Sequence, residues 1–239
     1  MTRLCVTIDT DWASEAALRL TIDHFESHGI PLTIFNTHDS DAVRSSLSRH
    51  EIGLHPFFGN NSDHGDDVAS VVRHVRGLPH NIAAFRCHRF AHSNESQEAM
   101  AEAGMLASSN ICTDLSVIPP FLERNGLLEV PVFFEDGGYL KRGHPLGDLS
   151  LLLAPQPVTC ARILVIHPMH FCLNTPDFTY MRRIKDSLSR KQWNELSAGD
   201  LDSLAFKQRG IRNLIEELLR RTRSFVTFSD ACQPRVIKA

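Results

Sequence analysis

The apolar run Leu4-Cys5-Val6-Thr7-Ile8 leads directly into Asp9-Thr10-Asp11-Trp12 near the start of the chain. The run predicts a core strand, and side chains two positions apart in a strand point to the same side. Asp9 and Asp11 are therefore expected side by side, about 6–7 Å apart. Two carboxylates that face one space repel each other unless they share a proton or a cation lies between them. A metal site is one interpretation; turn formation or helix capping, for which Ser14 is also available, is the other.

The composition indicates one globular domain. The chain has 239 residues, of which 42% are hydrophobic and 22% are charged, a length within the range of an α/β barrel. A formal net charge of −3 argues against a nucleic-acid partner, which requires a basic face. No apolar run approaches the roughly 20 residues that span a bilayer. We therefore expect one domain over residues 1–239, with no nucleic-acid partner and no transmembrane segment.

The six cysteines show no C-x-x-C pair and no regular spacing. Because Met1-Thr2-Arg3 leads straight into a core-type strand, we expect no signal peptide. All six cysteines are then predicted to be free thiols of a cytoplasmic protein, and a cysteine-based zinc site is not expected. They are Cys5, Cys87, Cys112, Cys160, Cys172 and Cys232.

Short apolar strands alternate with helical patterns, which is typical of parallel βαβ units. After His170 a polar stretch, about residues 174–200, predicts a partly helical excursion from the sheet. The expected strands are residues 4–8, 32–35, 51–54, 82–85, 162–166 and, closing the sheet, 225–228, with an extended segment at 127–134. The expected helices are residues 14–27, 41–49, 95–103 and 201–223, with another near Val68–Val75.

Polar side chains recur where these strands end. In parallel α/β folds, ligands and catalytic groups gather at the carboxyl ends of the strands. Histidines scattered through a core would not sort in this way, so the sorting favours a chemical role. The residues concerned are Asp9, Asp11, His38, His55, Arg86, His88, His167 and His170.

These residues carry a family resemblance. Thr7-Ile8-Asp9-Thr10-Asp11, His50-Glu51-Ile52-Gly53-Leu54-His55-Pro56, Arg86 and Val165-Ile166-His167 resemble, in order, motifs of NodB-type polysaccharide deacetylases (carbohydrate esterase family four). The pattern with His167-Pro168-Met169-His170 resembles the WbmS-like branch associated with bacterial O-antigen biosynthesis. The resemblance implies an α/β fold of the deformed (β/α)7 barrel type and metal-dependent removal of an N-acetyl group from an amino sugar.

The resemblance also implies roles for particular residues. Asp9 corresponds to the catalytic base, Arg86 to the arginine that orients it, and His167 to the general acid. Asp11 and His55 correspond to metal ligands. The family's second metal histidine has no counterpart, because Gly59 occupies its position.

His64 is the nearest replacement for that histidine, and Asp63 is the fallback. One carboxylate and two imidazoles suit one catalytic divalent ion, for which we expect zinc. We expect Asp11, His55 and His64 as its ligands, although His64 also fits an ordinary loop residue. His38, His88 and His170 are placed to contact substrate, and a core role is the alternative for His170.

Three functions stay open at this point. The first is a deacetylase acting on a nucleotide-linked, lipid-linked or oligosaccharide amino sugar. The others are a different metal-dependent ester or phosphoester hydrolase, and a sugar-binding protein that has lost catalysis. The basic segment 182–191 fits a phosphate clamp, but a solvated charged helix is the more common explanation of such a segment.

Overall fold

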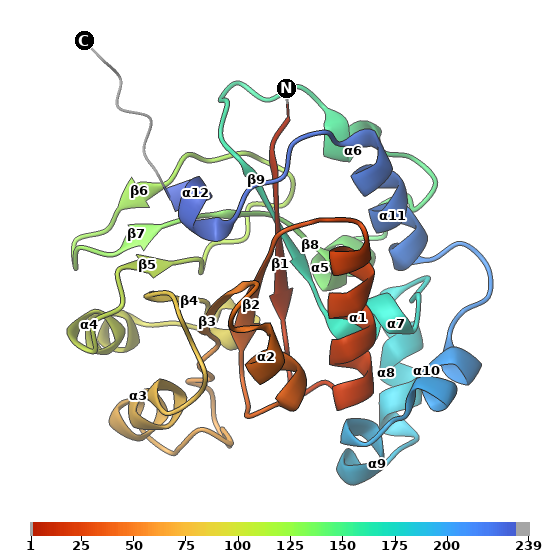
Figure 1. Ribbon diagram of the computed structural model, residues 1–239. Coiled ribbons are helices and arrows are strands. Elements are labelled where there is room, and N and C mark those ends of the chain that lie inside the picture. The colour runs from red at the N-terminus through yellow and green to blue at the C-terminus, as the bar shows by residue number, and fades with distance from the viewer. Residues whose placement is uncertain (1, 233–239) are drawn as a thin grey trace.

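The computed structural model describes residues 2–232 and places a strongly curled, mostly parallel sheet at the centre of the chain (Figure 1). The strand order is β6-β7-β5-β4-β3-β2-β1-β9-β8, and only β6 runs antiparallel to its neighbour. This arrangement confirms the predicted α/β fold of the deformed-barrel type. The strands are β1 (Leu4–Asp9), β2 (Leu32–Asn36), β3 (Glu51–Leu54), β4 (Ala84–Phe85), β5 (Ala107–Ser108), β6 (Phe121–Leu122), β7 (Leu128–Glu129), β8 (Val132–Glu135) and β9 (Arg162–Ile166).

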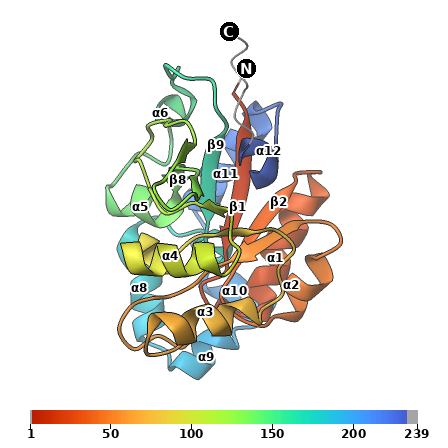
Figure 2. The same ribbon diagram turned by 90° about the vertical axis from the view of Figure 1, so that its left-hand side faces the viewer.

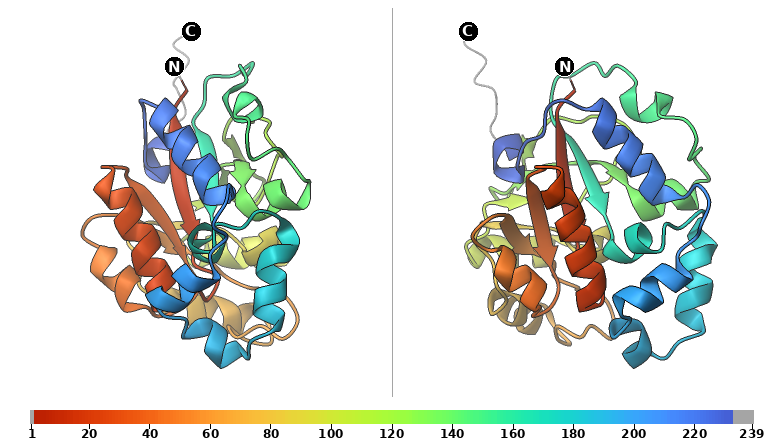
Figure 3. Two further views of the ribbon diagram at one scale, coloured as in Figure 1. Left: turned by 90° about the vertical axis from the view of Figure 1, so that its right-hand side faces the viewer. Right: turned by 45° about the vertical axis from the view of Figure 1, so that its right-hand side comes forward.

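Helices cover the outside of this sheet, as the side views show (Figures 2 and 3). A 3-10 turn, η1 (His88–Phe90), follows β4. The helices are α1 (Glu15–Ser27), α2 (Asp41–Ser46), α3 (Val68–Arg76), α4 (Asn94–Glu102), α5 (Asp136–Lys141), α6 (Ser150–Leu153), α7 (Pro168–Cys172), α8 (Phe178–Asp186), α9 (Arg190–Asn194), α10 (Ala198–Leu204), α11 (Ile211–Arg221) and α12 (Phe228–Cys232).

Strand β1 is the centre of the core, and all six of its residues are buried. It pairs in parallel with β2 on one side and with β9 on the other. Helix α1 begins where predicted, because the Ser14 side chain accepts a hydrogen bond from the Ala17 N–H. Its apolar face then packs on α7, with the Phe25 and Phe171 ring centroids 5.5 Å apart. The apolar pattern of the sequence therefore fixes the central layer.

The edge strand β8 is met by the extended chain that follows β5. Cys112 forms a parallel bridge with Val132, and the N–H groups of Thr113 and Leu115 donate to the carbonyls of Val132 and Phe133 at 2.9 and 2.8 Å. These bonds satisfy backbone groups that a free sheet edge would leave unpaired. The curled sheet is thereby drawn toward closure without a further regular strand.

Two predicted elements were wrong. The helix predicted at 201–223 is two helices, because α10 ends at Leu204 and α11 begins at Ile211. The Asn174 side-chain amide donates to the carbonyls of Phe206 and Gln208 at 3.0 and 2.9 Å, which satisfies backbone groups in the break. The closing strand at 225–228 is reduced to one bridge between Leu4 and Phe225, since α12 already begins at Phe228.

Gly53 in β3 is required by close packing. A Cβ at this position would lie 2.8 Å from the Ala84 carbonyl oxygen and 2.9 Å from the Phe35 ring. We expect Gly53→Ala to lower the free energy of unfolding by about 1–3 kcal/mol, because the strand and ring must shift. Gly147→Ala is the matched control, since no atom lies within 4 Å of its added methyl group. Equal midpoints for both variants in urea unfolding would contradict this account of β3.

Candidate active site

Four of the predicted site residues lie at the carboxyl ends of parallel strands of the sheet. Asp9 is the last residue of β1, while His55, Arg86 and His167 directly follow β3, β4 and β9. Because these strands run parallel in one sheet, with β2 between β3 and β1, their ends meet at one edge of the curled sheet.

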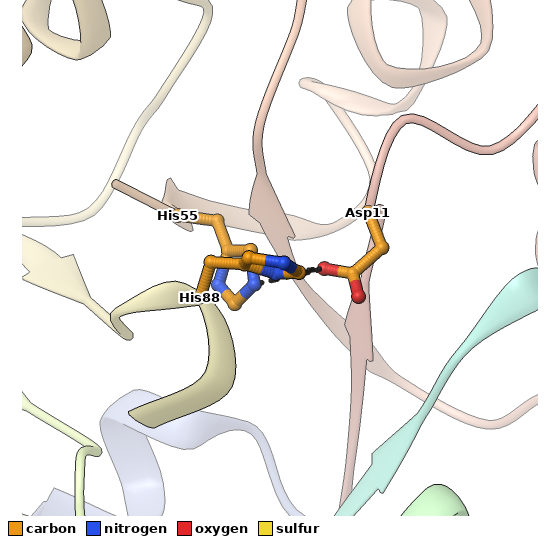
Figure 4. Close-up of side chains that lie close together, drawn as sticks. All are labelled: Asp11, His55 and His88. Carbon is orange, nitrogen blue, oxygen red and sulfur yellow. Dashed lines mark hydrogen bonds and ion pairs between the residues drawn. The ribbon is translucent and has the colours of Figure 1, made fainter. Parts of the chain in front are cut away.

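Asp11, His55 and His88 form a compact group at this edge (Figure 4). The Asp11 Oδ1 lies 3.0 Å from Nε2 of His55 and 2.9 Å from Nδ1 of His88. His55 is buried, whereas the Asp11 side chain keeps 25% of its exposure. The group is thus anchored on the inside and reachable from solvent.

A strained turn brings Asp11 into this group. Strand β1 ends at Asp9, and Asp11 and Trp12 both have left-handed backbones with φ of 44° and 53°. The Thr37 hydroxyl accepts from the Trp12 N–H at 3.1 Å and holds the turn. The premise that Asp9 and Asp11 share one strand face was therefore wrong. Left-handed non-glycine residues cost about 1–3 kcal/mol and concentrate at functional sites.

The donor set of this group fits a divalent cation. Burial opposes ionisation of Asp11, but His167 and the hydrogen bonds from His55 and His88 outweigh it, holding the pKa of Asp11 well below its usual value. An ionised carboxylate converging with two imidazoles is a ligand set that zinc and similar ions accept. Asp11, His55 and His88 could therefore hold a metal ion.

The structure does not bring His64 to this group. Its Nδ1 accepts from the Phe57 N–H at 3.1 Å, and its Nε2 donates to the Thr37 carbonyl at 2.7 Å. With both ring nitrogens engaged, His64 fixes the loop behind Trp12, whose ring centroid lies 5.1 Å away. Asp63, the fallback ligand, forms an ion pair with Arg190 of α9 instead.

Asp9 and Arg86 form a buried ion pair beside the group. Arg86 Nη1 donates to the Asp9 Oδ1 at 2.6 Å and to the Thr7 hydroxyl at 2.8 Å. Its other nitrogens donate to the carbonyl and hydroxyl of Ser109, and its guanidinium stacks 4.3 Å from the Phe35 ring centroid. The second Asp9 oxygen lies 3.7 Å from His55 Nε2. Arg86 therefore fixes a carboxylate that faces the histidines.

His167 is held by a carboxylate that directly follows β8. Its Nδ1 lies 2.5 Å from Oδ1 of the fully buried Asp136, and its Nε2 lies 3.4 Å from Asp11 Oδ2. Burial lowers the pKa of His167, but Asp136 and Asp11 outweigh burial and raise it well above the usual value. Glu135 lies 3.6 Å from the same ring, and burial raises its pKa to about 7. The position of Glu135-Asp136 after an apolar strand was the missed signal.

The remaining predicted substrate residues lie near this edge but have partners of their own. His170 Nδ1 lies 2.8 Å from the Thr175 hydroxyl, and burial lowers the pKa of His170 to about 4. His38 Nδ1 lies 2.9 Å from the Thr37 hydroxyl. Substrate contact by either histidine stays a prediction. His88, predicted as a substrate residue, instead lies in the Asp11 group.

The basic segment after α7 is mostly engaged within the protein. Arg182 pairs with Asp186 at 3.1 Å, and Arg183 donates to the Thr179 hydroxyl at 2.9 Å. Lys185 lies 5.6 Å from the Trp193 ring centroid. These contacts favour the solvated-helix interpretation of the segment over the phosphate clamp.

Comparison with known families decides the classification. The WbmS-like polysaccharide deacetylase family matches residues 6–185, about three quarters of the chain. The chain belongs to this family. The match includes Asp9, Asp11, His55, Arg86 and His167. No curated protein gives a significant match.

Solved structures share the fold of this WbmS-like protein. A candidate polysaccharide deacetylase involved in O-antigen biosynthesis from Bordetella bronchiseptica matches with a TM-score of 0.80 and 23% identity, over 92% of this chain and 91% of that one. A candidate polysaccharide deacetylase from Mycobacterium smegmatis gives 0.56 and 14%, over 97% and 90%. A CE4 family pseudoenzyme from Bacillus anthracis gives only 0.47 and 10%, over 97% and 66%, which supports no conclusion.

Within residues 2–232, no helix combines the length and apolar character that crossing a bilayer requires.

Proposed function

We propose that this protein is a metal-dependent hydrolase that removes the N-acetyl group from an amino sugar of a bacterial surface polysaccharide, of the O-antigen type, or of its precursor. The observation that carries the proposal is the convergence of the Asp11–His55–His88 group with two further residues, Asp9, which is bound by the Arg86 guanidinium, and His167, which is bound by the Asp136 carboxylate. The name of the Bordetella bronchiseptica relative supports the choice of polymer.

Asp11, His55 and His88 would hold the divalent ion, for which zinc is proposed. When bound, such an ion supplies Lewis-acid polarisation of a carbonyl and makes water easier to deprotonate. Asp9 would accept the proton of the attacking water, since one of its oxygens faces His55 while Arg86 holds the other. The Arg86 guanidinium, itself held by Thr7 and Ser109, orients that carboxylate.

His167 would return a proton to the leaving amine. Its Nδ1 is occupied by Asp136, so Nε2, which faces Asp11, is the nitrogen available to substrate. Asp136 also accepts from the His167 backbone N–H at 2.7 Å, which fixes the ring orientation from two directions. A protonated imidazole at this point supplies the general acid that an amine leaving group requires.

Asp136→Asn is expected to lower kcat by about 10–100-fold with little change in KM, because His167 keeps its place but loses the carboxylate that orients and charges it. Steady-state deacetylation kinetics measure the effect. Asp148→Asn is the control, since that exposed carboxylate accepts hydrogen bonds from the Ser150 N–H and hydroxyl. A kcat equal to that of the control would remove Asp136 from the proton-transfer unit.

The direct test of the function is amine release from a panel of N-acetyl sugars after loading with zinc, cobalt or manganese. The panel contains N-acetylglucosamine and N-acetylgalactosamine, their UDP derivatives and chitooligosaccharides, with acetyl esters and phosphoesters beside them. Amine release that disappears with chelator and in Asp9→Asn is the expected result. Turnover of esters or phosphates alone would favour the other hydrolases. Sugar binding without any turnover would favour the inactive binding protein.

A cytoplasmic location is part of the same proposal. All six cysteines are free thiols, and Cys5 and Cys87 are fully enclosed in the core. Unpaired cysteines are the usual state in a reducing compartment.

A further inference from the structure

The turn that follows Arg86 presents two side chains in different directions. His88 reaches Asp11, whereas the next residue, Arg89, is exposed to solvent. Arg89 and Phe90 have left-handed backbones, with φ of 59° and 55°. The His88 N–H donates to the Pro56 carbonyl at 2.8 Å, which ties the turn to the loop after β3. A backbone conformation that is unfavourable for residues other than glycine therefore lies beside the candidate metal group.

The Arg89 guanidinium is stacked rather than ion-paired. Its Cζ lies 5.7 Å from the Phe57 ring centroid, and the Phe57 ring meets the His88 ring edge-on at 5.0 Å. The Phe57 ring therefore contacts both the guanidinium and one residue of the metal group. Stacking on an aromatic face leaves the N–H edge of an arginine free to bind an acceptor.

No carboxylate of the described residues pairs with this arginine. Within residues 2–232, Arg89 forms no ion pair or hydrogen bond, whereas the exposed Arg142 and Arg190 pair with Asp114 and Asp63. The positive charge beside the candidate active site is thus uncompensated. A planar guanidinium matches the oxygens of a carboxylate or phosphate, especially where its orientation is already restricted.

We propose that Arg89 selects substrates whose amino sugar carries an anionic group, a carboxylate or a phosphate, near the N-acetyl group. The inference rests on the proposed function for the position of the sugar. The acetamide would lie at the Asp11–His55–His88 group while the anion extends past Phe57 to Arg89. Phe57 contacts both Arg89 and His88, so the guanidinium and the metal group lie on neighbouring side chains of one surface turn.

The test measures binding by calorimetry on zinc-loaded protein. The probes are methyl N-acetylglucosaminide, N-acetylglucosamine 1-phosphate and N-acetylglucosaminuronic acid. The wild type is expected to bind at least one anionic probe about tenfold more tightly than the neutral one. Arg89→Gln should abolish that ratio, and Arg89→Lys should keep part of it, because the charge remains and the fork is lost.

The matched control is Arg220→Gln. Arg220 lies in α11 and borders an open hollow of about 540 Å³. The chain after α11 reaches Ser224, whose carbonyl accepts from the N–H of Leu4, the first residue of β1. Arg220 is therefore near the end of β1 opposite Asp9. The control should leave the anionic-to-neutral ratio unchanged. A preference for the phosphate alone would identify an activated sugar, and one for the carboxylate alone an acidic sugar residue.

Three results would overturn the role of Arg89. They are no binding of either anionic probe, equal affinity for neutral and anionic probes, and an anionic-to-neutral ratio that is unchanged in Arg89→Gln. Amine release from the same samples tests the proposed function separately. Charge-dependent binding without amine release would retain the anion site and reject deacetylation of these sugars. Amine release without charge-dependent binding would support deacetylation and reject the anion site at Arg89.

Discussion

Replacing His88 with alanine is expected to weaken zinc binding by at least about 100-fold, because the ion loses one of three protein ligands. Even changes to residues that only orient a metal ligand typically cost 10–100-fold in affinity, and His88 would contact the ion itself. Its Nδ1 lies 2.9 Å from Asp11 Oδ1, so both donors are already directed at one point. Competition titration with a chromophoric chelator measures the affinity.

His64→Gln distinguishes this ligand set from the one expected from sequence. It should retain zinc, since both His64 nitrogens bind backbone groups of Phe57 and Thr37. His92→Ala controls for the loss of an exposed histidine, whose Nδ1 lies 3.0 Å from the Phe90 carbonyl. If His64→Gln lost the ion and His88→Ala kept it, His64 rather than His88 would be the third ligand.

Asp9→Asn is expected to lower kcat by roughly 10²–10⁴-fold while zinc remains bound, because an amide cannot accept the proton of water. The substitution preserves the volume of the side chain and its contact distance to Arg86. Arg86 keeps its bonds to Thr7 and Ser109, so the fold should survive the loss of the ion pair. Single-turnover deacetylation, with bound zinc quantified in the same sample, separates the two effects.

The matched control for Asp9→Asn is Asp63→Asn, which neutralises a carboxylate paired with Arg190 near the surface. Its kcat should stay within a factor of about two of wild type, as expected for a surface ion pair worth at most ~1 kcal/mol. A wild-type rate in Asp9→Asn would show that another group removes the proton.

The central layer of the fold could be predicted because its signals are local. Apolar runs such as Leu4–Ile8 and Arg162–Ile166 became β1 and β9, and Ser14 capped α1 as expected. The break between α10 and α11 could not be predicted, because the side chain that satisfies it, Asn174, lies some thirty residues earlier in the chain. Where distant groups replace local hydrogen bonds, periodicity alone predicts a longer helix.

The position of the candidate site could be predicted from the sequence, but the contacts among its side chains could be predicted less well. The rule that polar residues gather at strand ends located Asp9, Arg86 and His167 correctly at one edge. The rule could not assign His88 to Asp11, because that contact depends on the left-handed turn at Asp11 and Trp12. Asp136 follows the same rule, but its neighbours Gly137 and Gly138 gave the segment the composition of a turn.

The most direct measurement is a crystal structure of the zinc-loaded protein with anomalous diffraction collected at the zinc edge. The account predicts one peak within about 2.0–2.2 Å of Asp11, Nε2 of His55 and Nδ1 of His88. A peak on His64, or among Glu135, Asp136 and His167, would contradict it, as would the absence of any peak from protein that stays folded in excess zinc.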